Sequence, residues 1–218
     1  MRIRKRSWTE EELKLAKFYI DTPKEYKGKW KSAFKEEKTI HIELGCGKGQ
    51  FIANLACKNP SINFIGIDLI DTMLGLAKRN VEDVYKKENR EIDNIILTRH
   101  NIEQILEIMD KQDEVERIYI NFCNPWPRGK HHKKRLTHQK QLELYKTLLK
   151  AGGEIRFKTD DDNLFFDSLN YFEQAGFKII WKTQDLHNEN IEENIMTEHE
   201  EMFSKQGIKI KAIIAQYS

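Results

Sequence analysis

The stretch Ile42-Glu43-Leu44-Gly45-Cys46-Gly47-Lys48-Gly49-Gln50-Phe51 decides the fold. The apolar residues 39–44 predict a strand that leads into it, and residues 51–58 predict a helix that stops before Pro60. Glycines permit positive φ angles and a close approach of a ligand to the backbone, so this order indicates a binding edge of an α/β sheet. The glycine spacing is G-x-G-x-G, not the G-x-G-x-x-G of dinucleotide sites. Glu43 beside it would repel a pyrophosphate and suits a ligand with a cationic amine.

Strands and helices alternate along the rest of the chain. We expect strands at residues 39–44, 62–67, 95–98, 115–122, 154–158, 177–181 and 208–217. We expect helices at residues 9–20, 51–58, 71–87, 137–150 and 163–174, the first opened by a capping box at Thr9-Glu10-Glu11-Glu12. This alternation predicts an α/β fold with a mainly parallel, seven-stranded sheet and helices on both faces. Residues 1–38 are then a basic N-terminal extension with one helix, and residues 39–218 form the main domain.

Composition excludes several classes of protein. The chain has 218 residues, of which 39% are apolar, which suffices for one core without disulfides or metals. No apolar run reaches the ~18 residues of a membrane span, and no apolar stretch follows the basic first residues as in a signal peptide. Three cysteines are too few and too scattered for a disulfide framework or a zinc cluster. We therefore expect a cytoplasmic protein with reduced thiols, no metal and no membrane association.

Charge is unevenly distributed although 37 basic residues nearly balance 35 acidic ones. Residues 1–38 carry twelve Lys/Arg against seven Asp/Glu, and residues 128–140 carry six Lys/Arg, three histidines and no acid. The second block follows Pro-Trp-Pro, where Trp126 offers a flat face for stacking a base and the bases behind it suit phosphates. The acidic residues 185–201 are interpreted mostly as solvated surface.

Two further polar residues end predicted strands. Asp68 lies 23 residues beyond Gly45, where an acid can accept both hydroxyls of a ribose. Asn101 follows the third strand, where its amide could bind an adenine edge. Together with Glu43 and the glycine turn, these residues resemble the S-adenosylmethionine pocket of Rossmann-like methyltransferases.

A longer motif narrows the resemblance. Residues 121–136, Asn-Phe-Cys-Asn-Pro-Trp-Pro-Arg-Gly-Lys-His-His-Lys-Lys-Arg-Leu, are similar to the hallmark of the bacterial, single-subunit tRNA (guanine-N7-)-methyltransferase family, D-P-W-P followed by K/R-H-x-K-R-R-L. Phe157-Lys158-Thr159-Asp160 and Met196-Thr197-Glu198-His199-Glu200 match as well. The resemblance spans nearly the full chain, from Arg2-Ile3-Arg4 to the last strand.

The resemblance implies roles for individual residues. Those that it assigns to S-adenosylmethionine are Glu43, Gly45, Gly47, Gly49, Asp68, Asn101 and Asn124. Those that it assigns to the RNA substrate are Arg128, Asp160, Thr197, Glu198, His199 and Glu200. Asp68 stands where the family usually has glutamate, and Asn124 stands at its catalytic aspartate. The implied partner is tRNA, methylated on a guanine of the variable loop, by an enzyme without an obligatory protein subunit that is a monomer or a homodimer.

The chemistry of guanine N7 bears on Asn124. N7 carries an in-plane lone pair and no proton at neutral pH, so methyl transfer to it needs alignment more than a general base. Our hypothesis is therefore an active enzyme in which Asn124 positions rather than accepts a proton, while Asp160, Glu198 or Glu200 could supply negative charge near the guanine.

Three alternatives stay open. Asn124-Pro125-Trp126 also resembles the Asn-Pro-Pro-aromatic loops of methyltransferases that act on exocyclic amines of bases. An RNA-binding protein of this fold that has lost catalysis is another alternative. A nicotinamide oxidoreductase is disfavoured by the glycine spacing.

Overall fold

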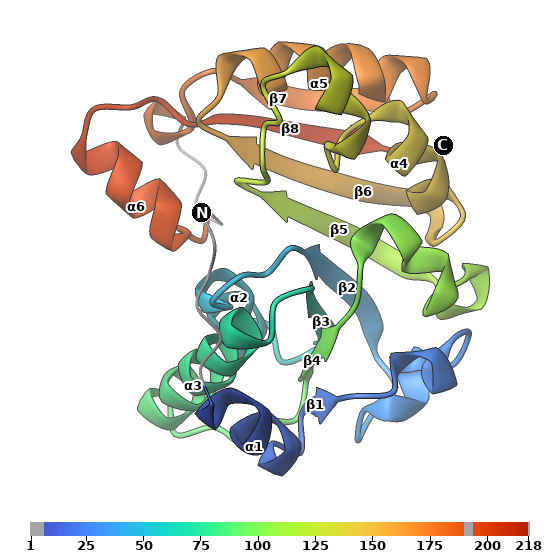
Figure 1. Ribbon diagram of the computed structural model, residues 1–218, viewed down its shortest axis with the longest axis vertical. Coiled ribbons are helices and arrows are strands. Elements are labelled where there is room, and N and C mark those ends of the chain that lie inside the picture. The colour runs from blue at the N-terminus through green and yellow to red at the C-terminus, as the bar shows by residue number, and fades with distance from the viewer. Residues whose placement is uncertain (1–6, 190–193, 218) are drawn as a thin grey trace.

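The computed structural model describes residues 7–189 and 194–217, and one sheet runs through its centre (Figure 1). Within these ranges eight strands follow the order β1-β4-β3-β2-β5-β6-β8-β7. The strands are β1 (Tyr19–Ile20), β2 (Thr39–Leu44), β3 (Ile62–Asp68), β4 (Ile95–Arg99), β5 (Val115–Asn121), β6 (Leu149–Thr159), β7 (Lys178–Thr183) and β8 (Lys211–Gln216). Pairs from β1 to β6 are parallel, whereas β8 lies antiparallel between β6 and β7. The predicted mainly parallel α/β fold is confirmed.

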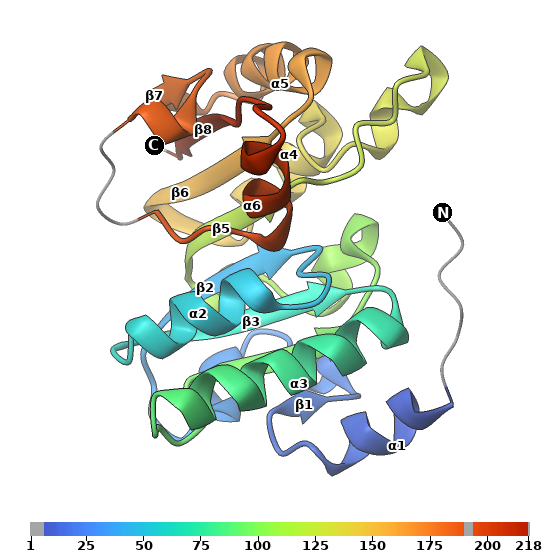
Figure 2. The same cartoon turned by 90° about the vertical axis from the view of Figure 1, so that its left-hand side faces the viewer.

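Helices cover both faces of the sheet. They are α1 (Trp8–Leu15), α2 (Gln50–Lys58), α3 (Asp71–Lys87), α4 (Gln139–Lys146), α5 (Asp162–Gln174) and α6 (Glu198–Lys205). Helices α2 and α3 lie side by side on one face with α1 next to α3, and α4 and α5 cover the other (Figure 2). Helix α6 lies beyond the carboxyl ends of the central strands, away from both layers (Figure 1).

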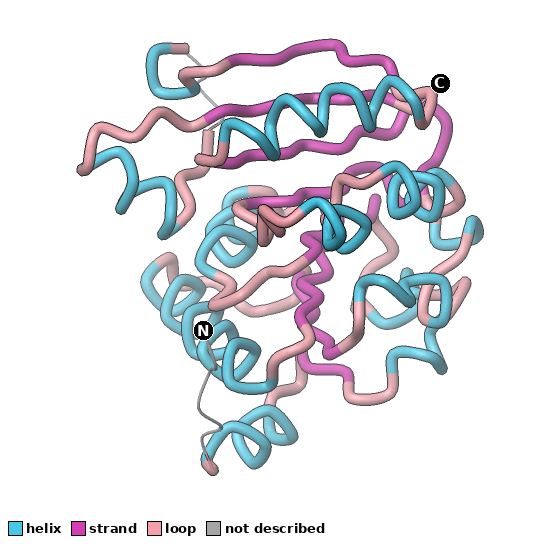
Figure 3. The backbone as a smooth tube through the Cα atoms, turned by 45° about the horizontal axis from the view of Figure 1, so that its top comes forward, coloured by secondary structure: helices cyan, strands magenta, loops and turns pink. Residues whose placement is uncertain are grey.

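Alternating side chains of the strands supply the two halves of the core. On β5, Ile118 and Ile120 pack with α4 and α5, whereas Tyr119 packs with α2 and α3. A strand that is buried on both faces reads as a nearly continuous apolar run, which is why these strands could be found from the sequence. Figure 3 shows the strands following one another across the twisted sheet between the helices.

The N-terminal region contributes to the same core. Trp30 is fully buried, and its indole Nε1 donates a hydrogen bond of 2.7 Å to the Ile108 carbonyl. The division at residue 38 stays a prediction. Arg2, Ile3 and Arg4, where the family resemblance begins, lie outside the described residues.

Several predicted boundaries were wrong, the first of them near the N-terminus. The first helix begins at Trp8, without a capping hydrogen bond from Thr9, and ends at Leu15 instead of continuing to residue 20. Residues 19 and 20 form β1 and pair with β4, which gives the sheet eight strands instead of seven. Backbone pairing at a sheet edge outweighs helix propensity there, because Leu97 N donates to the Phe18 carbonyl at 2.8 Å.

Two further predictions were wrong in the C-terminal half of the chain. Helix α4 ends at Lys146, and β6 already begins at Leu149, because Leu149 pairs with Val115 before an irregularity in the ladder. Helix α6 was not expected at all, since its residues read as a charged surface. In the described part of the chain, no helix has the length and apolar character needed to cross a bilayer.

Candidate active site

The glycine turn joins β2 to α2 at the carboxyl edge of the sheet. Gly45, Gly47 and Gly49 all have positive φ angles, of 77°, 54° and 69°. A Cβ on Gly49 would lie 2.6 Å from Cβ of Ala77, so glycine is required where α2 packs against α3. A Cβ on Gly47 would meet no atom within 4 Å. The turn therefore has one tightly packed side and one open side, which a ligand can approach.

Asp68 at the end of β3 holds this turn. Its Oδ2 accepts a hydrogen bond of 2.9 Å from Gly47 N, and its Oδ1 accepts one of 2.9 Å from Ile70 N. Burial raises the pKa of the Asp68 carboxyl, and the backbone donors oppose that rise. The carboxylate is thus fixed beside the open side of the glycine turn, where it can also accept from hydroxyl groups of a ligand.

Glu43, near the end of β2, is more deeply buried than Asp68. Its side chain is only 3% exposed, and its Oε1 accepts a hydrogen bond of 2.9 Å from Asn121 Nδ2. Burial raises the pKa of Glu43 to about 8, the Asn121 hydrogen bond lowers it, and the charge of Asp68 raises it further. No described residue donates to Oε2. A buried carboxylate oxygen without a donor is unfavourable unless a ligand supplies one.

Asn101 and Asn124 both shape loops with their own side chains. Asn101 Oδ1 accepts from Glu103 N at 3.1 Å and caps the turn after β4. Asn124 Oδ1 accepts from Trp126 N at 3.0 Å, which closes an Asx turn. An aspartate at position 124 would accept the same bond, so the change from the family residue keeps this turn. Phe122 and Trp126, on either side of it, have positive φ angles of 50° and 43°.

The basic block divides into an exposed part and a buried part. Its exposed bases are Arg128, Lys130, Lys133, Lys134 and Lys140. Arg135, in contrast, is 1% exposed, pairs with Asp167 at 2.5 Å and donates to the Pro125 carbonyl at 2.6 Å. The expectation that the whole block contacts phosphates is therefore wrong for Arg135, which instead fastens the Pro-Trp-Pro loop to α5. Lys134 Nζ lies 4.9 Å from the ring centroid of half-buried Trp126.

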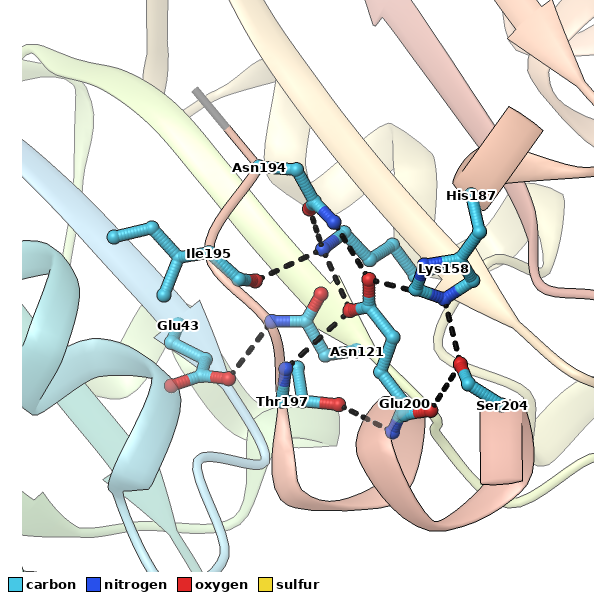
Figure 4. A network of polar contacts seen from close by, with 9 residues as sticks. All are labelled: Glu43, Asn121, Lys158, His187, Asn194, Ile195, Thr197, Glu200 and Ser204. Atoms are coloured by element: carbon cyan, nitrogen blue, oxygen red, sulfur yellow. Dashed lines mark hydrogen bonds and ion pairs between the residues drawn. The ribbon is translucent and has the colours of Figure 1, made fainter. Parts of the chain in front are cut away.

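Thr197 and Glu200, two predicted RNA residues, face inward. Thr197 Oγ1 accepts from Glu200 N at 2.9 Å, and Thr197 N donates to Glu200 Oε2 at 3.3 Å, which is a capping box at the start of α6. Glu200 is fully buried and forms an ion pair of 2.9 Å with Lys158 of β6 (Figure 4). Lys158 Nζ also donates to Asn194 Oδ1 at 2.5 Å and to the Ile195 carbonyl at 3.1 Å. These contacts dock α6 on the sheet.

Glu198 and His199 face outward from the same turn. Glu198 pairs with Lys48 of the glycine turn at 2.8 Å. The His199 ring stacks on Phe122 with centroids 5.8 Å apart and an interplanar angle of 19°. Both side chains are exposed, so they can reach a large substrate that covers this edge.

The topology brings the predicted site residues to one edge. Along the order β4-β3-β2-β5-β6, the carboxyl ends carry Asn101, Asp68, Glu43, Asn124 and Asp160. Asp160 is half-buried, and its backbone carbonyl accepts from Lys211 Nζ at 2.8 Å. Arg128 stays exposed at the start of the basic turn 129–134. Ligands of doubly wound sheets bind along such an edge. Among the residues that the structure describes, no three His, Cys, Asp or Glu side chains come close enough for a metal ion.

Sequence reasoning missed Asn121 and Lys158 as residues of the site. Both are polar residues at the carboxyl ends of otherwise apolar strands, and they are partners in the register of β5 and β6. Their position at the strand ends was the signal that could have identified them. Their partners Glu43 and Glu200 are distant in the sequence, so the sequence did not show these pairings.

Comparisons with known proteins agree with this geometry. A family model described as "Putative methyltransferase" matches residues 37–213. A protein from Clostridium beijerinckii named tRNA (guanine-N(7)-)-methyltransferase is 58% identical over 99% of this chain and 98% of its own length. A protein of the same name from Acetivibrio thermocellus is 49% identical over 99% of each chain. The solved structure of the 16S rRNA methyltransferase KamB aligns with a TM-score of 0.58, covering 100% of this chain and 96% of that one, but at 14% identity it supports the fold alone. The chain thus belongs to the tRNA (guanine-N(7)-)-methyltransferase family.

Proposed function

We propose that this protein transfers a methyl group from S-adenosylmethionine to N7 of a guanine in the variable loop of tRNA. The observation that carries the proposal is the 58% identity, over 99% of the chain, to a protein named for this reaction. The site supports it, because a buried acid, an open glycine turn and exposed bases share one edge of the sheet. We propose further that the enzyme acts in the cytoplasm, without an obligatory protein subunit, as a monomer or a homodimer.

The residues at this edge fit a sulfonium nucleoside with a cationic amino group. Glu43 Oε2 lacks a donor among the described residues and would accept from the amine. The open side of Gly47 would admit the ligand to the backbone, and Asp68 would accept from the ribose hydroxyls. Asn101 would contact the adenine. When bound, S-adenosylmethionine would supply an electrophilic methyl group to the lone pair of guanine N7, with its sulfur as the leaving group.

The protein's part in the reaction is alignment, which alone can contribute ~7–11 kcal/mol. Asn124 holds the loop that would face the guanine, and Asp160 lies one strand farther along the edge. Arg128 and the outward residues Glu198 and His199 would contact the RNA, whereas Thr197 and Glu200 would hold those two in place. No general base is needed, since N7 carries no proton.

The decisive experiment is incubation with unmodified tRNA and methyl-labelled S-adenosylmethionine, followed by digestion to nucleosides and chromatography. We expect label in 7-methylguanosine. Label in a nucleoside methylated on an exocyclic amine would replace the proposal with the first alternative. Binding of both substrates without any label would favour the RNA-binding protein that has lost catalysis.

Asn124 gives a first prediction about catalysis. Asn124→Asp should change turnover by less than about tenfold, because the carboxylate keeps the bond to Trp126 N. Asn124→Ala should lower turnover by about a hundredfold, since a loop displaced by ~1 Å can cost that much. Single-turnover methylation at saturating tRNA measures both. An increase of orders of magnitude in Asn124→Asp at unchanged tRNA affinity would contradict the positioning role.

The basic block gives a second prediction. Lys133 is exposed, so Lys133→Ala should remove one phosphate contact and lower the slope of log affinity against log salt by about 0.7–0.9. Arg135→Met is the matched comparison from the same block, because Arg135 is buried and paired with Asp167. It should lower the unfolding midpoint and leave the slope unchanged. Filter binding of tRNA over a salt series, together with urea unfolding, separates the two effects, and equal slope changes would contradict this division.

Glu43 gives a third prediction, on pH. Its raised pKa of about 8 means that the free protein holds this carboxyl mostly protonated at neutral pH, whereas a cationic amine binds the carboxylate form. Affinity for S-adenosylhomocysteine should therefore increase from about pH 6 to pH 7.5, by up to about tenfold per pH unit. Glu43→Gln should abolish the increase. Calorimetric titrations at several pH values test this, and a flat profile in the unmodified protein would contradict the assigned role.

A further inference from the structure

Asn121 is the last residue of β5 and lies beside Glu43 of β2. The two strands are neighbours in the sheet, with Glu43 opposite Tyr119, so Asn121 stands just beyond Glu43 along the same edge. The Asn121 amide donates to Glu43 Oε1 at 2.9 Å (Figure 4). Asn121 has no place among the residues that the family resemblance assigns to the donor or to the RNA.

This hydrogen bond makes the two oxygens of Glu43 unequal. Oε1 has a donor, and Oε2 has none among the described residues. A glutamate side chain has several rotatable bonds, and a hydrogen bond to one oxygen restricts how its carboxylate can turn. The Asn121 amide therefore leaves one defined oxygen for a cationic ligand.

Lys158 is the cation whose charge acts on Glu43, and its hydrogen bonds go to other residues. Its ammonium binds Glu200 Oε2, Asn194 Oδ1 and the Ile195 carbonyl. It exerts an attraction on Glu43 from a distance but forms no hydrogen bond with it in the described part of the chain. The buried carboxylate of Glu43 thus keeps its capacity for an external ammonium group.

We propose that Asn121 is a positioning residue of the methyl-donor pocket, whose amide holds Glu43 so that Oε2 receives the donor's cationic amino group. The inference rests on the proposed function, because it takes the donor to carry such an amine. Asn121 acts through Glu43 and does not itself contact the reacting atoms.

The titration of Glu43 supports this role. Burial raises its pKa to about 8, and the Asn121 hydrogen bond is the largest influence in the opposite direction. The other charged groups that face Glu43 are Asp68 on β3, which raises its pKa, and Lys158 on β6, which lowers it. Buried Cys46 in the glycine turn has a strongly raised thiol pKa and stays uncharged at neutral pH. Loss of the amide should therefore move the titration of Glu43 to higher pH.

The test compares two ligands, S-adenosylhomocysteine and its analogue in which hydrogen replaces the amino group. Calorimetry on the full chain at neutral pH gives both affinities. We expect the unmodified protein to prefer the amine by about 10- to 100-fold, and Asn121→Leu to reduce affinity for S-adenosylhomocysteine by about tenfold or more. Affinity for the deaminated analogue should stay the same, and the pH profile for S-adenosylhomocysteine should move upward. Asn121→Ala repeats the test if leucine impairs folding.

Controls separate positioning from general damage. Asn194→Ala removes another asparagine side chain, whose hydrogen bonds are with Lys158 and Glu200, and should leave the preference for the amine unchanged. In a Glu43→Gln background, Asn121→Leu should have no further effect on the preference, as expected for two residues that act as one unit.

Two results would overturn the inference. If Asn121→Leu weakens both ligands equally, Asn121 has only a structural role. If the unmodified protein binds both ligands equally well, Glu43 does not receive the amine, and the proposed positioning role of Asn121 is refuted as well. Absence of binding of either ligand would instead refute the proposed function itself.

Discussion

Lys158→Met is expected to lower the free energy of unfolding by about 3–5 kcal/mol, because it leaves the fully buried Glu200 carboxylate without its ammonium partner. Lys158 itself is only 14% exposed, so solvent screens this pair weakly. Burial lowers the pKa of Lys158 and the charge of Glu200 raises it, as expected for a buried ammonium paired with a carboxylate. The double variant Lys158→Met/Glu200→Leu should recover part of the loss, since an apolar pair removes both charges together, whereas Thr197 N and Asn194 Nδ2 lose their acceptor.

A second ion pair of α6 provides the matched control. Lys48 and Glu198 are 45% and 52% exposed, and Lys48→Met should cost no more than about 1 kcal/mol. Urea unfolding followed by fluorescence measures all three variants. Equal losses in Lys158→Met and Lys48→Met would mean that the buried pair does not dock α6.

Gly49→Ala is expected to lower the free energy of unfolding by about 2–5 kcal/mol. An alanine in the left-handed conformation costs about 1–2 kcal/mol, and its Cβ, 2.6 Å from Cβ of Ala77, adds about 1–3 kcal/mol of overpacking. The strain falls where the first turn of α2 packs against α3, so the alanine must separate the two helices or distort the glycine turn. The unfolding midpoint in urea at constant slope gives the loss directly.

Gly47→Ala is the matched comparison in the same turn. Its φ of 54° is also left-handed, but a Cβ there would meet no atom within 4 Å. We expect a loss of only about 1–2 kcal/mol, together with weaker binding of S-adenosylhomocysteine, because the methyl group projects to the open side of the turn. Gly47→Ala as unstable as Gly49→Ala, with full ligand affinity, would contradict the assignment of the two sides.

The sequence predicted the parallel half of the fold well. Residues 39–44 form the expected strand and residues 71–87 the expected helix, both with the expected bounds. Buried strands and amphipathic helices leave strong periodic signals in the sequence. Glu43 and Asp68 could be placed at the carboxyl edge for the same reason, since each lies at the end of an apolar strand. Their roles toward the donor remain proposals.

The remaining features depend on contacts between distant residues. Two residues of β1 pair with an edge strand and leave no periodic pattern. Glu200 lies in a charged segment, and its burial depends on partners that include Lys158, 42 residues earlier. Arg135 reads as one more exposed base of the block, although Asp167 and the Pro125 carbonyl bury it. Local sequence carries no signal for such partners.

The pairing of β1 with β4 also bears on aggregation. An uncovered strand at the edge of a sheet offers free N–H and carbonyl groups to another chain. Tyr19 and Ile20 cover Leu97 and Thr98, and the Thr98 hydroxyl donates to the Ile20 carbonyl at 2.7 Å. The opposite edge, β7, exposes Lys178 and Lys182, whose charges discourage such pairing in another way. One edge of this sheet is therefore protected against self-association by a two-residue strand and the other by its lysines.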